Sequence, residues 1–227
     1  MGVAEVLTDR VTREKLGLVG LAEVRANLWP VNCQTCGQPL GADPPVLCVD
    51  DIMIFGSASL HHLACQAPRW RSQGRLSPAR GGSSQAIRLL LVPVEPEGQR
   101  GPEPLMLVNP SLEVVLLAPD NDRWHVDTVA AYGKLGLQSF KEIGGCTTPV
   151  SGAAARLCGD VVDIQLAKAE CWQGHADPPI RDRIRDVGHV LLAVATCIYP
   201  DEVDAFDDLT AALEDGQIAL GWVDLST

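Results

Sequence analysis

Aromatic residues, lysines and long apolar runs are all scarce in this 227-residue sequence. Only 4% of the residues are aromatic, so a hydrophobic core has to be built mainly from Val, Leu, Ile and Ala. No apolar run approaches the roughly 20 residues that a membrane-spanning helix needs, and the longest candidate is Val190 to Ile198. The N-terminus lacks the basic start and apolar stretch of a secretory signal. We therefore expect a cytoplasmic protein.

Eight cysteines are too few and too irregularly spaced for a disulfide scaffold. In a reducing compartment, closely spaced cysteines more often bind a metal or carry out redox chemistry. Cys146, Cys158, Cys171 and Cys197 are scattered among apolar or small neighbours. Because a free cysteine behaves as a small hydrophobic residue, we interpret these four as buried thiols.

The cysteines between residues 32 and 70 follow a metal-binding pattern. Two residues separate Cys33 from Cys36. After a further 25 residues, His62 and Cys65 have the same spacing. Two-residue spacing lets both members of a pair reach one ion from a tight turn, and Gly37 can adopt the positive φ that such a turn requires. The sequence therefore predicts a zinc site with four protein ligands, which stabilises a fold and leaves no position for substrate.

Two ligand choices stay open at this stage. His61 is an alternative to His62, and Cys48 is an alternative ligand or a neighbour of the site. The arrangement resembles treble-clef and related zinc fingers, in which the second ligand pair lies at the start of a helix. Its spacing is similar to that of the finger in poly(ADP-ribose) polymerases. The resemblance covers only residues 32–70, and no nucleic-acid-reading residue is carried over from it.

Charge differs between the two halves of the chain. Residues 1–100 carry a net charge of +1 and residues 101–227 a net charge of −12. An acidic protein repels a phosphate backbone, so any nucleic-acid contact has to be local. One group of arginines has no acid between its members and forms the candidate phosphate contacts: Arg69, Arg71, Arg75, Arg80 and Arg88. We favour the interpretation that they belong to a solvated linker over a phosphate-binding strip.

The pattern of apolar residues and turn formers predicts an α+β protein. We expect a helical segment over residues 1–30, which Thr8 or Asp9 can cap and which Gly17 and Gly20 divide or bend, followed by a treble-clef-like zinc module up to residue 70. A linker over 71–85 and an acidic α+β domain over 86–227 complete the chain. Within the module, Val46–Asp50 and Ile52–Phe55 are expected to form a hairpin. The linker, RSQGRLSPARGGSSQ, contains little that a core could bury.

In the acidic domain we expect strands over 87–94, 105–108, 112–117, 161–166 and 218–225. A helix is expected from Asp122 to Leu135. A helical pair precedes the last strand. Its first member starts at Asp177 with an apolar stripe from Ile180 to Ile198, and its second covers the acidic residues 201–215. Residues 189–198 taken alone also fit a buried strand.

No catalytic motif is present. His125, His175 and His189 have no partner recognisable in the sequence, and the Gly-rich segment 143–152 matches no phosphate-binding loop. The favoured hypothesis is a non-enzymatic interaction or regulatory protein with a structural zinc ion and a protein partner. The alternative is an enzyme whose active site lies unrecognised in the acidic domain.

Overall fold

The computed structural model divides into two compact units. It describes residues 2–72, 83–93, 101–121, 123–167, 170–202 and 205–226. The first unit comprises Met1–Gln85, Pro110–Thr128 and Thr196–Tyr199. The second unit comprises Ala86–Asn109, Val129–Ala195 and Pro200–Thr227. Most of the expected linker, residues 73–82, lies outside the described residues, so that boundary stays a prediction.

The first unit begins with helix α1 (Arg10–Ala26). Asp9 caps it, because its carboxylate accepts a hydrogen bond from the Thr12 amide at 2.7 Å. Gly17 interrupts the helix with a φ of 66°, a conformation that glycine adopts without steric cost. The helix covers only part of the expected segment 1–30, and it is kinked at Gly17.

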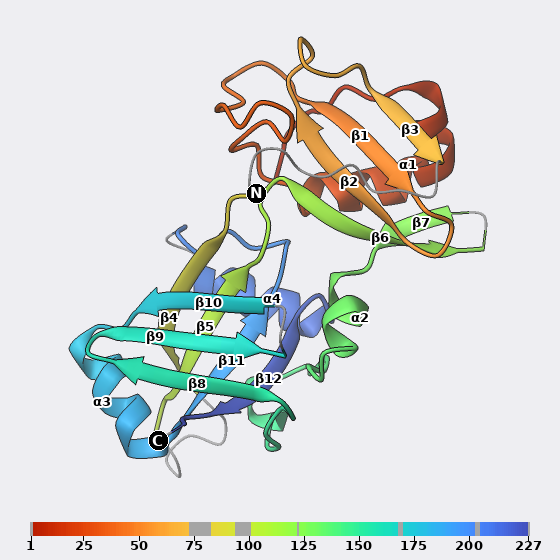
Figure 1. The fold of residues 1–227 in the computed structure, drawn as a ribbon. Helices are drawn as coiled ribbons and strands as arrows, with labels where there is room; N and C mark the ends of the chain where they lie inside the picture. The colour runs from red at the N-terminus through yellow and green to blue at the C-terminus, as the bar shows by residue number, and fades with distance from the viewer. Residues whose placement is uncertain are drawn as a thin grey trace. The chain divides into compact units, whose positions relative to one another are not determined.

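A five-stranded sheet forms the rest of the first unit (Figure 1). Its order is β3 (Arg69–Ser72), β1 (Val46–Asp51), β2 (Gly56–His61), β6 (Val114–Asp120) and β7 (Arg123–Val126). Strands β1 and β2 form an antiparallel hairpin that pairs Val46 with His61 and Asp51 with Gly56. The expected second strand of the hairpin was misplaced, because residues 52–55 form the connection.

Helix α1 packs on this sheet through one apolar cluster. Leu16 and Val24 of the helix and Trp124 of β7 are buried in it. The expectation of a helix from Asp122 was wrong over residues 123–126, because these residues pair with β6 as an edge strand. The helix, α2 (Thr128–Gly133), starts only after them.

The second unit contains two sheets that pack against each other (Figure 1). The four-stranded sheet has the order β12 (Ala219–Asp224), β11 (His189–Val194), β5 (Glu103–Asn109) and β4 (Ala86–Val92). The three-stranded sheet has the order β10 (Glu170–His175), β9 (Val161–Leu166) and β8 (Ala153–Cys158). A short 3₁₀ turn, Ile143–Gly145, precedes it.

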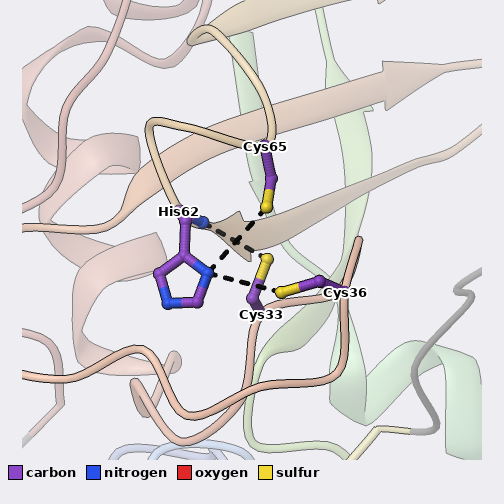
Figure 2. Close-up of side chains that lie close together, drawn as sticks. All are labelled: Cys33, Cys36, His62 and Cys65. Carbon is purple, nitrogen blue, oxygen red and sulfur yellow. Dashed lines mark hydrogen bonds between the residues drawn. The ribbon is translucent and has the colours of Figure 1, made fainter.

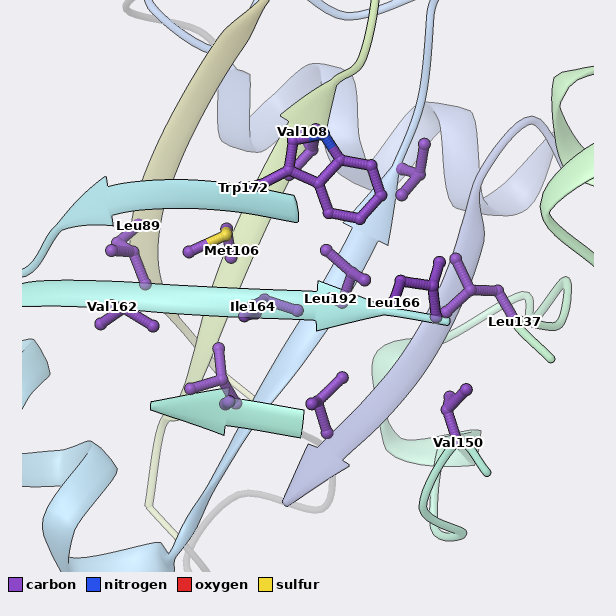
Figure 3. Packing of buried hydrophobic residues seen from close by; sticks show 14 of the residues in the cluster. Leu89, Met106, Val108, Leu137, Val150, Val162, Ile164, Leu166, Trp172 and Leu192 are labelled. Carbon is purple, nitrogen blue, oxygen red and sulfur yellow. The ribbon is translucent and has the colours of Figure 1, made fainter. Parts of the chain in front are cut away.

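The main core lies between these two sheets (Figure 3). Val162, Ile164 and Leu166 of β9 face Met106 of β5 and Leu192 of β11. Helix α3 (Pro178–Val187) adds Ile180 and Ile184 to the same core. Helix α4 (Ala205–Glu214) covers the other face of the four-stranded sheet, as Figure 1 shows. Strands β5 and β11 are thus buried on both faces, which explains their continuous apolar sequences.

The expected helix from Asp177 to Ile198 is correct only in its first half. Helix α3 ends at Gly188, which has a φ of 76° and donates its amide hydrogen to the Ile184 carbonyl. Residues 189–194 then form β11. The chain therefore ends as helix, strand, helix and strand rather than as a helical pair and a strand. The broader prediction of a mixed α+β fold is confirmed.

Candidate metal centre

The first ligand pair lies in a tight turn at the end of a short hairpin. Asn32 pairs with Pro39, and the Cys33 amide donates to the Gln38 carbonyl at 2.8 Å. The Gly37 amide closes the turn by donating to the Cys33 carbonyl at 2.8 Å. Gly37 has a φ of 72°, as the sequence predicted. Both thiols consequently project from one short turn.

The second pair lies in a turn that follows strand β2. The Cys65 and Gln66 amides donate to the His62 carbonyl at 2.9 and 3.0 Å, and β3 begins a few residues later. This pair is therefore not at the start of a helix, and the treble-clef arrangement is not confirmed.

The two turns bring four potential ligands together (Figure 2). The Gln34 amide donates to the Leu60 carbonyl at 3.0 Å, which docks the first turn against the end of β2. One ligand atom from each of Cys33, Cys36, His62 and Cys65 lies within 4.8 Å of the other three. The group is close enough to hold a metal ion, and its composition is consistent with zinc.

The hydrogen bonds of His62 determine which ring nitrogen faces the sulfurs. Its Nε2 lies 2.9 Å from the Pro39 carbonyl oxygen, which can only accept, so Nε2 carries the hydrogen. The unprotonated Nδ1 then faces the sulfurs of Cys36 at 3.5 Å and Cys65 at 4.0 Å (Figure 2). A tetrahedral zinc ion with ordinary bond lengths separates sulfur and nitrogen ligands by about 3.6 Å. The two observed distances lie on either side of this value.

The thiols of the group differ in acidity. Burial alone would raise the pKa of Cys33, but hydrogen bonds from the backbone amides of His62, Cys36 and Thr35 outweigh it and lower the pKa to about 6. Desolvation, together with hydrogen bonds to Cys36 and Cys33 and their charges, raises the pKa of Cys65 to about 11. The sulfurs thus cannot all ionise side by side unless a cation offsets their repulsion. A divalent metal ion supplies that charge.

The two alternative ligands have other partners. The His61 ring lies 2.9 Å from both the Thr35 and the Ser59 hydroxyl oxygens, and burial lowers its pKa to about 4. The Cys48 thiol donates to the Ala67 carbonyl at 3.5 Å, and burial raises its pKa to about 11. Neither side chain belongs to the group of four.

The candidate phosphate-binding arginines that the structure describes have hydrogen-bond partners within the protein. Arg71 forms two hydrogen bonds of 2.9 Å with the Asp50 carboxylate, and Arg69 donates to the Gln66 side chain. In the second unit, Arg88 donates to the Pro200 and Glu202 carbonyls at 3.3 and 2.9 Å. Arg75 and Arg80 lie outside the described residues. The three described guanidinium groups are therefore all engaged within the protein.

An apolar groove of about 720 Å³ lies directly beside the ligand group. Its lining residues are Leu7, Leu40, Asp43, Pro44, Pro45, His62, Leu63, Ala64 and Cys65. Leu63, which stands between two ligands, is 61% exposed. The sequence does not predict this groove, because its walls come from three separate segments.

Glu113 is a second feature that sequence analysis missed. It is completely buried just before β6, and its carboxylate accepts a hydrogen bond from the Asn32 amide at 3.0 Å. The available signal was an acidic residue within the apolar run of residues 112–117. Nothing in the sequence connects it with Cys33.

The cysteines of the C-terminal half and His189 are not among the four candidate ligands. Cys146 is buried as expected and Cys197 is partly exposed, whereas Cys158 and Cys171 are exposed, so the expectation of four buried thiols was wrong for these two. His189 is buried, and its Nε2 lies 2.8 Å from the Glu103 carboxylate. Its ring also stacks on Trp222 at 3.6 Å.

Comparison with known proteins adds no functional residue. No family model, no curated protein and no solved structure matches the chain. In the part of the chain that the structure describes, no helix is long and apolar enough to cross a membrane.

Proposed function

We propose that Cys33, Cys36, His62 and Cys65 bind one structural zinc ion. Thiolates and imidazole are the ligands that zinc prefers in structural sites, and four of them complete its tetrahedron. The hydrogen bond from His62 Nε2 to the Pro39 carbonyl fits this role, because it orients the ring and leaves Nδ1 free to bind. A site filled by protein ligands leaves no position for water or substrate, which favours a stabilising role over catalysis.

A zinc K-edge absorption spectrum of the full chain, purified without added metal, tests this assignment. We expect three sulfurs at about 2.3 Å and one nitrogen at about 2.0–2.1 Å. An oxygen at bonding distance would indicate an open position and support the enzyme hypothesis. Absence of a zinc edge would refute the assignment.

We further propose that the first unit is a non-enzymatic protein-interaction module. The observation that carries this proposal is the apolar groove beside the ligand group, with exposed Leu63 on its wall. A large exposed apolar side chain at a concave surface is typical of an interaction site. Asp43 adds a negative charge to the lining. The partner that fits is a peptide segment with an apolar side chain and a neighbouring basic residue.

A peptide-display selection tests this proposal. Zinc-loaded protein serves as bait, and the Leu63→Asp variant removes peptides that bind elsewhere. We expect enrichment of sequences in which an apolar residue stands near Lys or Arg, and their affinity should fall at least tenfold on Leu63→Asp. Enrichment of no peptide sensitive to this substitution would contradict the proposal.

The two other hypotheses have less support. A buried histidine bonded to a carboxylate, such as His189 with Glu103, is an arrangement that orients a catalytic base. However, His189 Nδ1 lies 3.2 Å from the Val187 carbonyl, so both ring nitrogens are already engaged. A minor nucleic-acid contact at Arg69 and Arg71 would have to displace their present hydrogen bonds.

A further inference from the structure

Glu113 brings a buried carboxylate next to the first ligand turn. Its side chain is 0% exposed, and three N–H groups donate to it. These are the Asn32 amide at 3.0 Å, the Ser84 amide at 2.8 Å and the Gln34 side-chain amide at 3.4 Å. An ionised carboxylate is purely an acceptor and can satisfy all three donors at once.

These bonds connect Glu113 to both halves of the ligand group. Asn32 and Gln34 are the residues on either side of Cys33. The Glu113 carbonyl accepts from the Leu60 amide at 3.1 Å, and the Leu60 carbonyl accepts from the Gln34 amide at 3.0 Å. Leu60 stands two residues before His62. One residue distant in sequence thus holds the first turn and the end of β2 in register.

From this geometry we infer that Glu113 is a positioning residue for the metal site. Among the described residues, no hydrogen bond joins it to any of the four ligands, and it acts by fixing the backbone that carries them before the ion binds. The inference rests on the proposed zinc assignment. Residues that hydrogen-bond directly to metal ligands typically change metal affinity by 10- to 100-fold when they are replaced, and we expect an effect of the same order for Glu113.

The Glu113→Gln substitution tests the inference at nearly constant volume. It replaces one carboxylate oxygen by an amide that donates, so a buried N–H group loses its acceptor. We expect the affinity for zinc, measured by competition with a chelator, to fall about 10- to 100-fold. With Co²⁺ in place of zinc, the sulfur charge-transfer band should persist, whereas the d–d bands should shift or broaden because the ligand geometry relaxes.

Val115→Ala provides a matched control in the same unit. Val115 of β6 is buried in the core of the first unit, and its truncation destabilises that core without removing any hydrogen bond of the ligand turns. It should leave the Co²⁺ bands unchanged and reduce zinc affinity less than Glu113→Gln does. Equal losses of affinity with unchanged Co²⁺ bands in both variants would overturn the positioning role.

A milder variant covers the case in which Glu113→Gln fails to fold. Gln34→Met removes only the side-chain donor beside Cys33. It should weaken zinc binding about 3- to 10-fold, as expected for one long hydrogen bond of 3.4 Å, and unchanged affinity and bands would overturn the inference. A wild-type chain that binds neither zinc nor Co²⁺ would instead refute the zinc assignment itself.

Discussion

The two units of this protein are stabilised in different ways. The second unit has the larger apolar cluster, enclosed between two sheets, and few of its described polar residues are buried. The first unit has a smaller cluster on one sheet and buries many more polar side chains. Examples are Asp50, Asp51, His61 and Glu113.

The difference indicates how each unit responds to change. A buried polar group contributes to stability only while its partners remain in place, and it costs free energy when one of them is removed. An apolar core tolerates conservative changes and is insensitive to metal or protons. The stability of the first unit should therefore depend on bound metal and on pH. The stability of the second unit should depend mainly on the packing of its apolar core.

Loss of the metal should have the largest effect. Cys33→Ala removes a ligand, and structural zinc contributes about 10–16 kcal/mol in zinc-finger peptides, which is comparable with the whole stability of a domain. Calorimetry of the full chain should show that the transition of the first unit disappears, as it should when a chelator is added to the wild type. Cys146→Ala, a buried thiol of the second unit, is the control. Two intact transitions in Cys33→Ala would contradict the metal dependence.

Truncation of the main core should affect only the second unit. Leu192 is fully buried in that core, and Leu192→Ala should cost about 2–5 kcal/mol. Hydrogen exchange at increasing urea concentrations, detected by mass spectrometry, can measure the unfolding of each unit from its own peptides. Leu192→Met, which conserves volume, should cost less than about 1.5 kcal/mol. A parallel loss of zinc affinity in Leu192→Ala would show that the units do not respond separately.

Acid should affect the first unit through Asp51. Burial would raise its pKa, but hydrogen bonds from the Met53 amide, the Trp70 indole and the Ser72 hydroxyl, together with the Lys15 charge, outweigh burial and lower the pKa. A lowered pKa means that the carboxylate stabilises the unit at pH values above the unfolded pKa of about 3.9. This contribution is lost as pH falls through the folded pKa.

The Asp51→Asn variant should cost about 1–3 kcal/mol at neutral pH, because the donors lose an ionised acceptor. An NMR titration of the wild-type carboxyl groups should place Asp51 below the usual range. Asp208→Asn, at an exposed position in the first turn of α4, should cost less than about 1 kcal/mol. An Asp51 pKa at or above about 3.9 would contradict the expected pH dependence.

The features that sequence analysis predicted correctly depend on local chemistry. The spacing of Cys33, Cys36, His62 and Cys65 predicts that the four side chains lie close together, because each pair shares one turn. The start of α3 follows from the prolines after Asp177, and Asp9 caps α1 as expected. These signals lie within a few residues of the feature that they predict, and no tertiary contact is needed to recognise them.

The errors arise where tertiary contacts decide the structure. Residues 189–194 fit a helix or a buried strand equally well, and pairing with β5 and β12 makes them a strand. Strands β8 and β10 were missed because their short, mixed sequences become strands only by pairing with β9. Glu113 and the groove could not be predicted, since their partners lie in distant segments.

The smallest effect on stability is expected at Leu63, which lies on the surface of the first unit. Leu63→Asp changes an exposed side chain in a turn, so the free energy of unfolding should change by no more than about 0.5 kcal/mol. Leu18→Asp is the matched control, because Leu18 is 90% exposed on α1 and does not line the groove. Isothermal titration with a selected peptide should show binding lost for Leu63→Asp and retained for Leu18→Asp. Equal binding by both variants would place the interaction site away from the groove, and the metal would then stabilise a surface that has another role.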